Sequence, residues 1–398
     1  MKTIDALRAD TPALTDAPSD KPTLIHLNNA GAALPPSPVL RAMQEYLDLE
    51  AHIGGYEAAD KNAASIDGFY RAVARLLHTK PHNIAFATSA TDAYARVLSA
   101  IPFRPDDTIL TTENDYVSNQ IAFLALQKRM GVKLLRARDT ASGGVDVGDF
   151  EMLLKKHRPV LAAVTHVPTN SGLVQPVEAI GQICREHGVW YLADACQSAG
   201  QMTLDVERIG CDFLTATMRK FMRGPRGAGF LFASDRVLEA GLEMLFPDLR
   251  SADWLSADAY ATVPTARRFE YWEMSPALVL GSKAAAEYAL EVGTDWIENR
   301  VKELAAQLRH RLSALPGVQV LDQGTALCGI VTAYSPQWEA KGLLEKLQAH
   351  HINCRLSPLS VAQIDFSRKG VTWALRVSPH YYNTEEEIGR MVEVVGQR

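Results

Sequence analysis

Short apolar runs alternate with amphipathic segments over residues 107–234, and this alternation constrains the fold more than any other feature. The apolar runs have lengths typical of strands and lie at 107–113, 133–138, 159–167, 189–195 and 212–217, and GAGFLFAS closes the series. The segments between them place apolar residues at helical spacing. Continuously apolar strands that alternate with helices predict a mostly parallel sheet with helices on both faces, an α/β fold.

The pattern changes after this predicted sheet, and the change predicts a division of the chain. Residues 1–22 are expected to form an N-terminal arm and residues 23–275 a large domain. Residues 277–315 have the apolar spacing of one long helical stretch, and short strands alternate with helices after it. We therefore expect residues 276–398 to form a smaller α+β domain, with residues 265–276 as the connector.

Composition and charge argue against several classes of partner. The chain has 398 residues, 47% of them hydrophobic, which is enough for one large or two moderate domains. A net charge of −5 gives no overall attraction for nucleic acid. No run approaches the roughly 20 apolar residues that span a bilayer, and residues 1–22 lack the apolar core of a secretory signal. We therefore expect a cytoplasmic protein that binds neither nucleic acid nor a membrane.

The cysteines predict neither a disulfide framework nor a metal site. They are odd in number and scattered, and no two form a CxxC pair: Cys184, Cys196, Cys211, Cys328 and Cys354. Reduced thiols in a cytoplasmic protein are the simpler interpretation.

Two ionisable residues stand where predicted strands end, which is where open α/β sheets bind ligands. Asp194 closes the strand at 189–195, and a carboxylate buried there is costly unless it has a partner. Lys220 lies 26 positions later, just beyond the strand at 212–217. Pyridoxal phosphate requires such a pair, because a lysine must form its Schiff base and a carboxylate must keep its pyridine nitrogen protonated.

A phosphate seat is predicted beside this pair. Ala90 and Thr91 precede a helix that we expect to begin at about Asp92, and a helix N-terminus presents free N–H groups to an anion. Thr217 and Arg219 stand at the end of the strand that leads to the lysine. Together these residues would hold the phosphate, so the sequence predicts pyridoxal 5'-phosphate as the cofactor.

The motifs around these residues resemble the class V aminotransferase, or cysteine desulfurase-like, family of fold-type I pyridoxal-phosphate enzymes. TMRKFMRGPRGAGFL at 217–231 is similar to the lysine segment of that family, and residues 194–197 match its Asp-x-x-Gln. The resemblance extends from LNNAG at 27–31 to RVSPHYYNTEEEI at 376–388. It implies the fold-type I architecture, in which helices sandwich a mostly parallel central sheet and a smaller α+β domain follows.

The resemblance also implies roles around the cofactor. Lys220 would hold the Schiff base and then shuttle the α-proton. Asp194 would pair with the pyridine nitrogen, and Gln197 would lie near the ring hydroxyl. Thr169 occupies the position of an asparagine that contacts the cofactor in the desulfurases, and Asn170 is next to it.

Further implied roles involve the substrate and a second subunit. Arg376 would bind the α-carboxylate of a small amino-acid substrate, and Asn29 would line the same pocket. Tyr116 is the candidate for the aromatic ring that stacks on the cofactor. Enzymes of this fold usually build each active site from two subunits, so a homodimer is implied, with GGYEAAD at 54–60 coming from the partner and Tyr56 reaching the substrate.

Two departures from the family and three simpler interpretations stay open. Arg219 stands where the desulfurases usually carry histidine, and FEYWEMSP at 269–276 replaces a segment of small residues that reaches the partner's phosphate in many relatives. The simpler interpretations are a helix cap or salt bridge for Asp194, a structural brace for Arg376, and a core or interface aromatic for Tyr116.

Three other polar residues are expected to have no catalytic role. Arg223 and Arg226 are expected to be solvated or at an interface, with a phosphate contact as the alternative. His166 is expected to be a strand-end histidine whose hydrogen bonds are satisfied.

The position of the thiols bears on the reaction. A desulfurase needs a nucleophilic cysteine on a loop of the smaller domain, because a thiolate must attack the substrate sulfur. Cys354 precedes Arg355 at the predicted end of a strand, and no cysteine lies between 355 and 398. GGYEAAD and SPLSVAQIDFSRKG resemble instead the branch of ergothioneine-type C–S lyases and isopenicillin N epimerase-like proteins. We therefore expect a C–S lyase that acts by β-elimination on a cysteine-derived amino acid or S-conjugate.

Several other functions remain as alternatives. Cysteine desulfurase and amino-acid epimerase or racemase chemistry use the same cofactor, and transamination is less favoured by this branch. A protein that binds pyridoxal phosphate without turnover is a second class. A nucleotide-binding protein with GPRGAG at 224–229 as its phosphate loop is a third, although the chain lacks the Gly-Lys-Ser/Thr and GxGxxG patterns of such loops.

Overall fold

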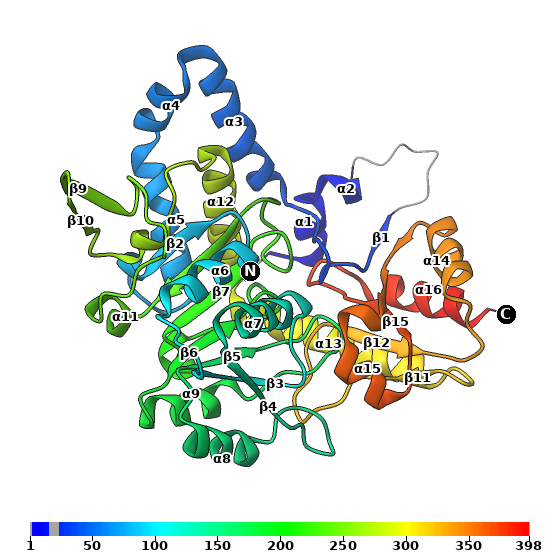
Figure 1. Ribbon diagram of the computed structural model, residues 1–398. Helices are drawn as coiled ribbons and strands as arrows, with labels where there is room; N and C mark the ends of the chain where they lie inside the picture. The colour runs from blue at the N-terminus through cyan, green and yellow to red at the C-terminus, as the bar shows by residue number, and fades with distance from the viewer. Residues whose placement is uncertain (1, 16–23, 398) are drawn as a thin grey trace.

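The computed structural model describes residues 2–15 and 24–397, and a seven-stranded sheet lies at its centre (Figure 1). Its strands lie in the order β2 (Ile84–Ala87), β8 (Gly229–Ala233), β7 (Phe213–Thr217), β6 (Trp190–Asp194), β5 (Leu161–Thr165), β3 (Thr108–Thr112) and β4 (Lys133–Ala137). Neighbours from β7 to β4 are parallel, whereas β8 is antiparallel to both β2 and β7. The mostly parallel sheet predicted from the sequence is therefore confirmed.

Helices cover both faces of this sheet because side chains along each strand alternate between two cores. Tyr191 and Ala193 of β6 pack into one core, and Leu192 between them packs into the other. The first core includes residues of α5 (Ala63–Leu76), α8 (Val147–His157), α9 (Val177–Glu186), α10 (Val206–Ile209) and α12 (Pro276–Val292). The second includes residues of α6 (Ala90–Ala100), α7 (Val117–Met130), α11 (Asp235–Glu239) and the short 3-10 helix η2 (Ala266–Phe269).

A second, four-stranded antiparallel sheet forms in the C-terminal part of the chain (Figure 1). Its strands lie in the order β11 (Gln319–Val320), β12 (Val331–Tyr334), β15 (Trp373–Val377) and β14 (Arg355–Pro358). It shares a buried core with α13 (Thr294–Ser313), α14 (Ala340–Ala349) and α16 (Glu385–Gly396). The short 3-10 helix η3 (Leu359–Val361) leads from β14 into α15 (Gln363–Lys369), and β1 (Ile25–His26) pairs with β13 (Ile352–Asn353).

The helical stretch predicted at 277–315 forms two helices, α12 and α13, because the chain turns at Gly293. Gly293 has a φ of 96°, which residues with a Cβ rarely adopt. After the turn, the two helices pack on different partners. α12 packs on α3 (Ser37–Ile53) and α5, whereas α13 packs on α16. The domain boundary between residues 275 and 276 stays a prediction.

Two projections extend from the large sheet (Figure 1). α3 continues into α4 (Gly55–Lys61), and β9 (Ala252–Ser256) forms an antiparallel hairpin with β10 (Ala259–Thr262). The sequence analysis did not predict this hairpin, whose side chains are mostly exposed and follow no burial pattern. Among the described residues, no helix is both long and apolar enough to cross a membrane.

The first helices of the chain dock onto its C-terminal segment. α1 (Ile4–Ala9) and α2 (Pro12–Thr15) belong to the arm predicted at 1–22, of which residues 1 and 16–22 lie outside the described residues. Arg8 of α1 pairs with Glu387 of α16 at 2.8 Å and donates to the carbonyl of Tyr382 at 2.9 Å. These contacts hold the two ends of the chain together.

Arg223 is fully buried at the junction of this arm with the loop that follows Lys220. It donates hydrogen bonds to the Leu34 carbonyl at 2.8 Å, the Tyr381 hydroxyl at 2.7 Å and the Thr11 hydroxyl at 2.7 Å. The sequence analysis expected Arg223 to be solvated or at an interface, and that expectation was wrong. Its hydrogen bonds and its position between three segments of the chain explain the difference.

Replacing Arg223 with methionine is expected to destabilise the fold. The substitution leaves the three buried oxygens that Arg223 contacts without their donor, at a cost of roughly 2–4 kcal/mol in the free energy of unfolding. Urea unfolding followed by circular dichroism measures this loss. Arg226→Met is the matched control, because Arg226 is exposed in the same loop and its replacement should change stability by less than about 0.5 kcal/mol. Equal stability of the two variants would show that Arg223 does not have this role.

Candidate active site

The N-terminus of α6 lies at the edge of the large sheet with two amide groups free. α6 begins at Ala90 rather than near Asp92, and its cap is Ser89, whose hydroxyl accepts from the Asp92 amide at 3.1 Å. In the described part of the chain, the amides of Ala90 and Thr91 have no hydrogen-bond acceptor. The helix end therefore has the free donors that an anion requires.

Thr217 lies beside this helix end, at the carboxyl end of β7. It pairs with Gly229 of β8, and a Cβ on Gly229 would lie 3.0 Å from the Ala90 nitrogen. The glycine therefore allows α6 to approach the strands closely. Arg219 follows two residues after Thr217 and donates to the carbonyl of Gly31, so the loop after β1 also lies here. We call this site, at the N-terminus of α6 and the carboxyl ends of β6 and β7, the seat.

Asp194 is buried at the end of β6, and its carboxylate accepts hydrogen bonds from two donors. Its Oδ1 accepts from the Cys196 amide at 2.9 Å, and its Oδ2 accepts from the Asn119 side chain at 3.0 Å. Asn119 lies on α7 and also donates to the second buried carboxylate, Asp115, at 3.1 Å. Burial raises the pKa of Asp115, and hydrogen bonds, with that from Thr165 foremost, oppose the rise. One side-chain amide thus holds two buried carboxylates in place.

Lys220 lies in this seat with only 6% of its surface exposed. Its Nζ is 5.8 Å from the ring centre of Tyr116, the aromatic predicted to stack on the cofactor. Burial lowers the pKa of the Lys220 amine, Asp194 raises it, and the nearby Arg219 and Arg376 lower it. The net result is a lowered pKa, which favours the uncharged amine that a reaction with an aldehyde requires.

Gln197 and Thr169 contact each other within the same seat. Gln197 Nε2 donates to the Ala30 carbonyl at 3.1 Å and to the Thr169 hydroxyl. Its Oε1 is buried and has no partner among the residues that the structure describes. An unpaired buried oxygen is costly. A bound ligand that donates a hydrogen bond to Gln197 Oε1 would remove this cost.

Arg376 of β15 reaches the seat from the smaller sheet. It donates to the Thr169 carbonyl at 3.1 Å and to Asn28 Oδ1 at 3.4 Å. Burial, with Arg219 and Arg355 nearby, lowers its pKa to about 10. Within residues 2–15 and 24–397 no carboxylate pairs with Arg376, and its Nε has no acceptor. A guanidinium with free donors suits a substrate carboxylate.

The side chain of Asn29 has partners other than this arginine. It donates to the Ser378 carbonyl at 2.8 Å and accepts from the Tyr382 hydroxyl at 2.5 Å. Asn28, the preceding residue, is the one that contacts Arg376. The sequence alone gave no reason to choose between two adjacent asparagines in LNNAG.

Two other predicted residues have contacts outside the seat. Asn170 is buried and donates to Asp365 of α15 at 2.9 Å, which ties the loop after β5 to the smaller part of the chain. Tyr56 lies on the projecting helix α4 with 73% of its surface exposed (Figure 1). Its role in the site of a second subunit stays a prediction.

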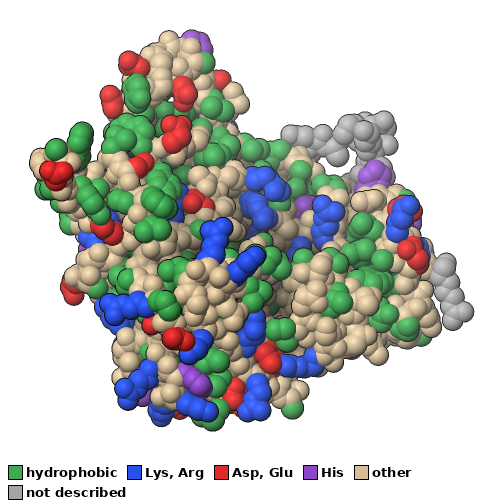
Figure 2. Space-filling view, in the orientation of Figure 1, with side chains coloured by type: hydrophobic (Ala, Val, Ile, Leu, Met, Phe, Trp, Pro, Cys, Tyr) green, Lys and Arg blue, Asp and Glu red, His purple; other side chains and the backbone are tan. Residues whose placement is uncertain are grey.

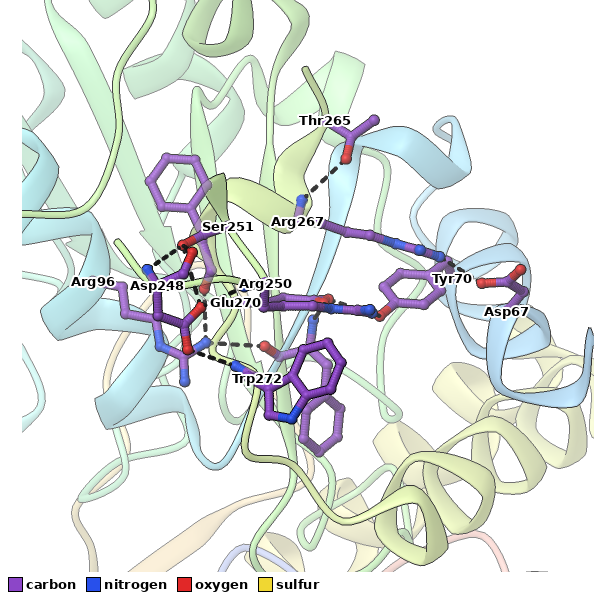
Figure 3. Close-up of polar contacts among 12 residues, drawn as sticks. Asp67, Tyr70, Arg96, Asp248, Arg250, Ser251, Thr265, Arg267, Glu270 and Trp272 are labelled. Atoms are coloured by element: carbon purple, nitrogen blue, oxygen red, sulfur yellow. Dashed lines mark hydrogen bonds and ion pairs between the residues drawn. The ribbon is translucent and has the colours of Figure 1, made fainter. Parts of the chain in front are cut away.

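The connector FEYWEMSP is tied to the large sheet by a buried carboxylate (Figure 3). Glu270 is fully buried and accepts from the Tyr70 hydroxyl at 2.8 Å, the Phe86 amide at 2.8 Å and Arg250 at 2.9 Å. Arg250 stands two residues before β9, so this ion pair fixes the base of the hairpin. Trp272 is half exposed, and its amide donates to Asp248 at 2.8 Å (Figure 3). The connector and the hairpin are thus anchored as one unit on the surface.

A cavity of about 910 Å³ lies elsewhere, between α9, α10 and the start of α13, and none of the predicted site residues line it. His166 does line it, and His166 Nδ1 is buried without a partner among the described residues. Burial lowers the pKa of His166 to about 4, so its ring is neutral near pH 7. The expectation that its hydrogen bonds would be satisfied was therefore wrong.

The residues at the strand ends fit the predicted cofactor. The free amides of Ala90 and Thr91 suit a phosphate, and the buried carboxylate of Asp194 suits a protonated ring nitrogen. Lys220 presents a buried amine, and Gln197 has an unpaired amide oxygen. A charged, hydrogen-bonding ligand would satisfy each of these groups.

The sequence analysis did not single out Asn28, Asp115, Asn119 or Cys196. Asp115 and Asn119 stand just after the predicted strand at 107–113, on either side of Tyr116. The predicted role of Tyr116 was the available signal. Cys196 lies between the two matched residues of the Asp-x-x-Gln motif.

Comparisons with known proteins agree with this geometry. A family model described as Aminotransferase class-V matches residues 25–391. A probable cysteine desulfurase of Methanothermobacter thermautotrophicus is 28% identical and covers 99% of this chain and 98% of that protein. Another, of Pyrococcus abyssi, is 26% identical, with 94% and 93% covered. The solved apo structure of a cysteine desulfurase from Thermococcus onnurineus superposes with a TM-score of 0.90 at 24% identity, covering 100% of this chain and 98% of that one.

The lowered pKa of Lys220 predicts how the apo chain reacts with added pyridoxal phosphate. The rate of covalent attachment should follow the uncharged fraction of the amine, so it should rise with pH and level off below the usual lysine value of 10.5. Visible absorbance measures the rate, with free Nα-acetyl-lysine as the reference and Lys220→Ala as the unreactive control. A pH profile that coincides with that of the free lysine would contradict the assignment.

Proposed function

The chain belongs to the class-V aminotransferase family of fold-type I pyridoxal-phosphate enzymes, and from that premise we propose that it cleaves the carbon–sulfur bond of cysteine or a cysteine-derived amino acid. The observation that carries the proposal is the buried amine of Lys220, with its lowered pKa, beside the buried carboxylate of Asp194. The curated relatives, which are named as probable cysteine desulfurases, support the choice of bond.

Each residue of the seat has a task in this proposal. Pyridoxal phosphate, when bound, supplies an electron sink for the carbanion that remains once the α-proton is removed. Lys220 Nζ takes that proton, because burial favours its uncharged form. Arg376 binds the α-carboxylate and so orients the bond to the α-proton. Asn119 and the Cys196 amide hold the Asp194 carboxylate in one orientation.

Two reactions can follow removal of the α-proton. In a desulfurase a protein thiolate attacks the substrate sulfur, and the Cβ–S bond breaks with its electron pair left on carbon. The products are a protein persulfide and, once Cβ is protonated, alanine. The curated relatives favour this reaction over the C–S lyase that we expected from the sequence. Cysteine desulfurase activity is therefore the first candidate.

The thiols of this chain favour elimination as the second candidate. Cys354, the last cysteine in the sequence, is buried, and burial raises its pKa to about 12. A buried, protonated thiol is a poor nucleophile. In elimination the Cβ–S bond breaks, and its electron pair leaves with the sulfur without any protein thiol.

The products formed from a panel of amino acids test the proposal and separate the two candidates. Cysteine and S-substituted cysteines are assayed for alanine, pyruvate, sulfide and loss of chirality. The assay contains an added thiol that reduces the protein persulfide, so alanine with sulfide from cysteine is expected of a desulfurase. Pyruvate, with sulfide from cysteine or a thiol from a conjugate, is expected of a lyase. Lys220→Ala should abolish every product, since it removes the group that takes the α-proton. Formation of the enantiomer alone, or of a keto acid from non-sulfur amino acids, would refute C–S cleavage.

We also propose that the enzyme is a homodimer. Exposed apolar side chains gather over the hairpin, the loop before it and α4, at the upper left of Figure 2: Tyr56, Leu245, Phe246, Leu249, Trp254, Leu255 and Tyr260. Large apolar side chains left exposed on one side of the molecule support a protein–protein contact there. Glu270 and Arg250 fix the hairpin in place, so the surface is preorganised for binding.

A mixture of two inactive variants tests whether the sites are shared. Tyr56→Ala is expected to lose activity through the partner's site, and Lys220→Ala through its own. Dimers that contain one subunit of each have one complete site, so co-expression should restore roughly a quarter of the parent activity. Analytical ultracentrifugation verifies the dimer. Activity no greater than the sum of the separate variants would show that Tyr56 does not act across the interface.

A further inference from the structure

A pocket of about 300 Å³ lies between α7 and the segment that runs from η3 into α15. The two sides contribute apolar side chains in equal number: Val117, Ile121 and Leu124 from α7, and Val361, Ala362 and Ile364 from the other segment. The three residues of α7 follow a helical spacing, so they form one face of that helix. The pocket therefore has two facing apolar walls.

This pocket adjoins the seat of Lys220 on two sides. Asp115 and Val117, the neighbours of Tyr116 in the chain, both line it. Asn170 lines it as well, and Asn170 follows Thr169. Tyr116 and Thr169 both belong to the seat, so direct chain neighbours of two residues of the seat line the pocket.

The carboxylates of Glu113 and Asp365, which line the pocket, have cationic partners. Asp365 pairs with Lys369 at 2.8 Å and accepts from Asn170 at 2.9 Å. Glu113 pairs with Arg368 at 2.7 Å. Asp115 and Arg136 also line the pocket, and Gln120 joins them: it donates to Asp115 at 2.6 Å and accepts from Arg136 at 2.8 Å. Because these charged groups already have partners, the apolar walls are the surface on which a ligand gains most.

We propose that this pocket receives the group carried on the sulfur of the substrate, and that the enzyme prefers cysteine S-conjugates with an apolar substituent to free cysteine. The inference rests on the proposed cleavage of a C–S bond. Free cysteine would leave the apolar walls in contact with water, whereas a conjugate would bury them. The site therefore selects for the substituent and not for the amino acid alone.

The reaction of such a conjugate balances without any further reactant except water. The Cβ–S bond breaks, the electron pair stays with sulfur, and a proton completes the departing thiol. One water is consumed, and pyruvate and ammonium are the other products. The substituent stays in the pocket while the bond breaks, so its binding energy can help to align the Cβ–S bond.

Steady-state kinetics of the holoenzyme test this preference. The substrates are cysteine, S-butylcysteine, S-phenylcysteine and S-carboxymethylcysteine, and turnover is measured as the sum of pyruvate and alanine. We expect kcat/KM for the butyl and phenyl conjugates to exceed that for cysteine by about tenfold or more. Val361→Trp fills the pocket and is expected to remove this preference while kcat/KM for cysteine stays within about twofold.

Two further variants make the outcome decisive. Ile121→Trp fills the pocket from the opposite wall at an exposed position, so the test stands even if the tryptophan at 361 disturbs folding. Val318→Trp is the matched control, because Val318 is also half-buried and does not line the pocket. Equal kcat/KM for cysteine and its conjugates, or a preference for the carboxymethyl group, overturns the inference and leaves C–S cleavage intact. Absence of turnover with every compound overturns C–S cleavage itself.

Discussion

A buried carboxylate at the end of β6 is tolerated only because the chain donates to both of its oxygens. The Cys196 amide binds one oxygen of Asp194 and the Asn119 side chain binds the other, and Asn119 in turn is held by Asp115. Without those donors, the buried carboxylate would be left with unpaired oxygens, which is costly. The carboxylate beside Lys220 therefore depends on α7 being correctly placed against the sheet.

The seat is assembled from segments that are far apart in sequence, and the sheet topology brings them together. β6 and β7 are parallel neighbours, so Asp194 and Thr217 emerge at the same edge. Arg376 comes from the smaller sheet and reaches Thr169 in the loop after β5. Any change in the angle between the two sheets would move the arginine relative to Lys220. The arm pinned by Arg223 and the pairing of β1 with β13 restrict that movement.

The sequence predicted those parts of the fold and site that follow from local pattern. The alternation of continuously apolar runs with helical segments predicted the parallel sheet, and the position of Asp194 and Lys220 after strands predicted that they lie in one seat. Contacts that depend on tertiary packing were not predictable in this way. Arg223 stands in a loop rich in glycine and arginine, where exposure is the usual outcome, and only the docking of the N-terminal arm buries it. The choice of Asn28 over Asn29 likewise depends on the orientation of a loop against β15.

Helix α7 serves the cofactor seat and the proposed substituent pocket with different faces. Asn119 and Phe123 are buried toward the sheet, whereas Val117, Ile121 and Leu124 face the pocket. The two sets are interleaved along the helix but separated around its axis. Residues of the pocket face can therefore change without moving Asn119, so the proposed substrate preference can vary while the hydrogen bond from Asn119 to Asp194 stays in place. Under the proposed function, this separation would let one seat for proton removal accept different groups on sulfur.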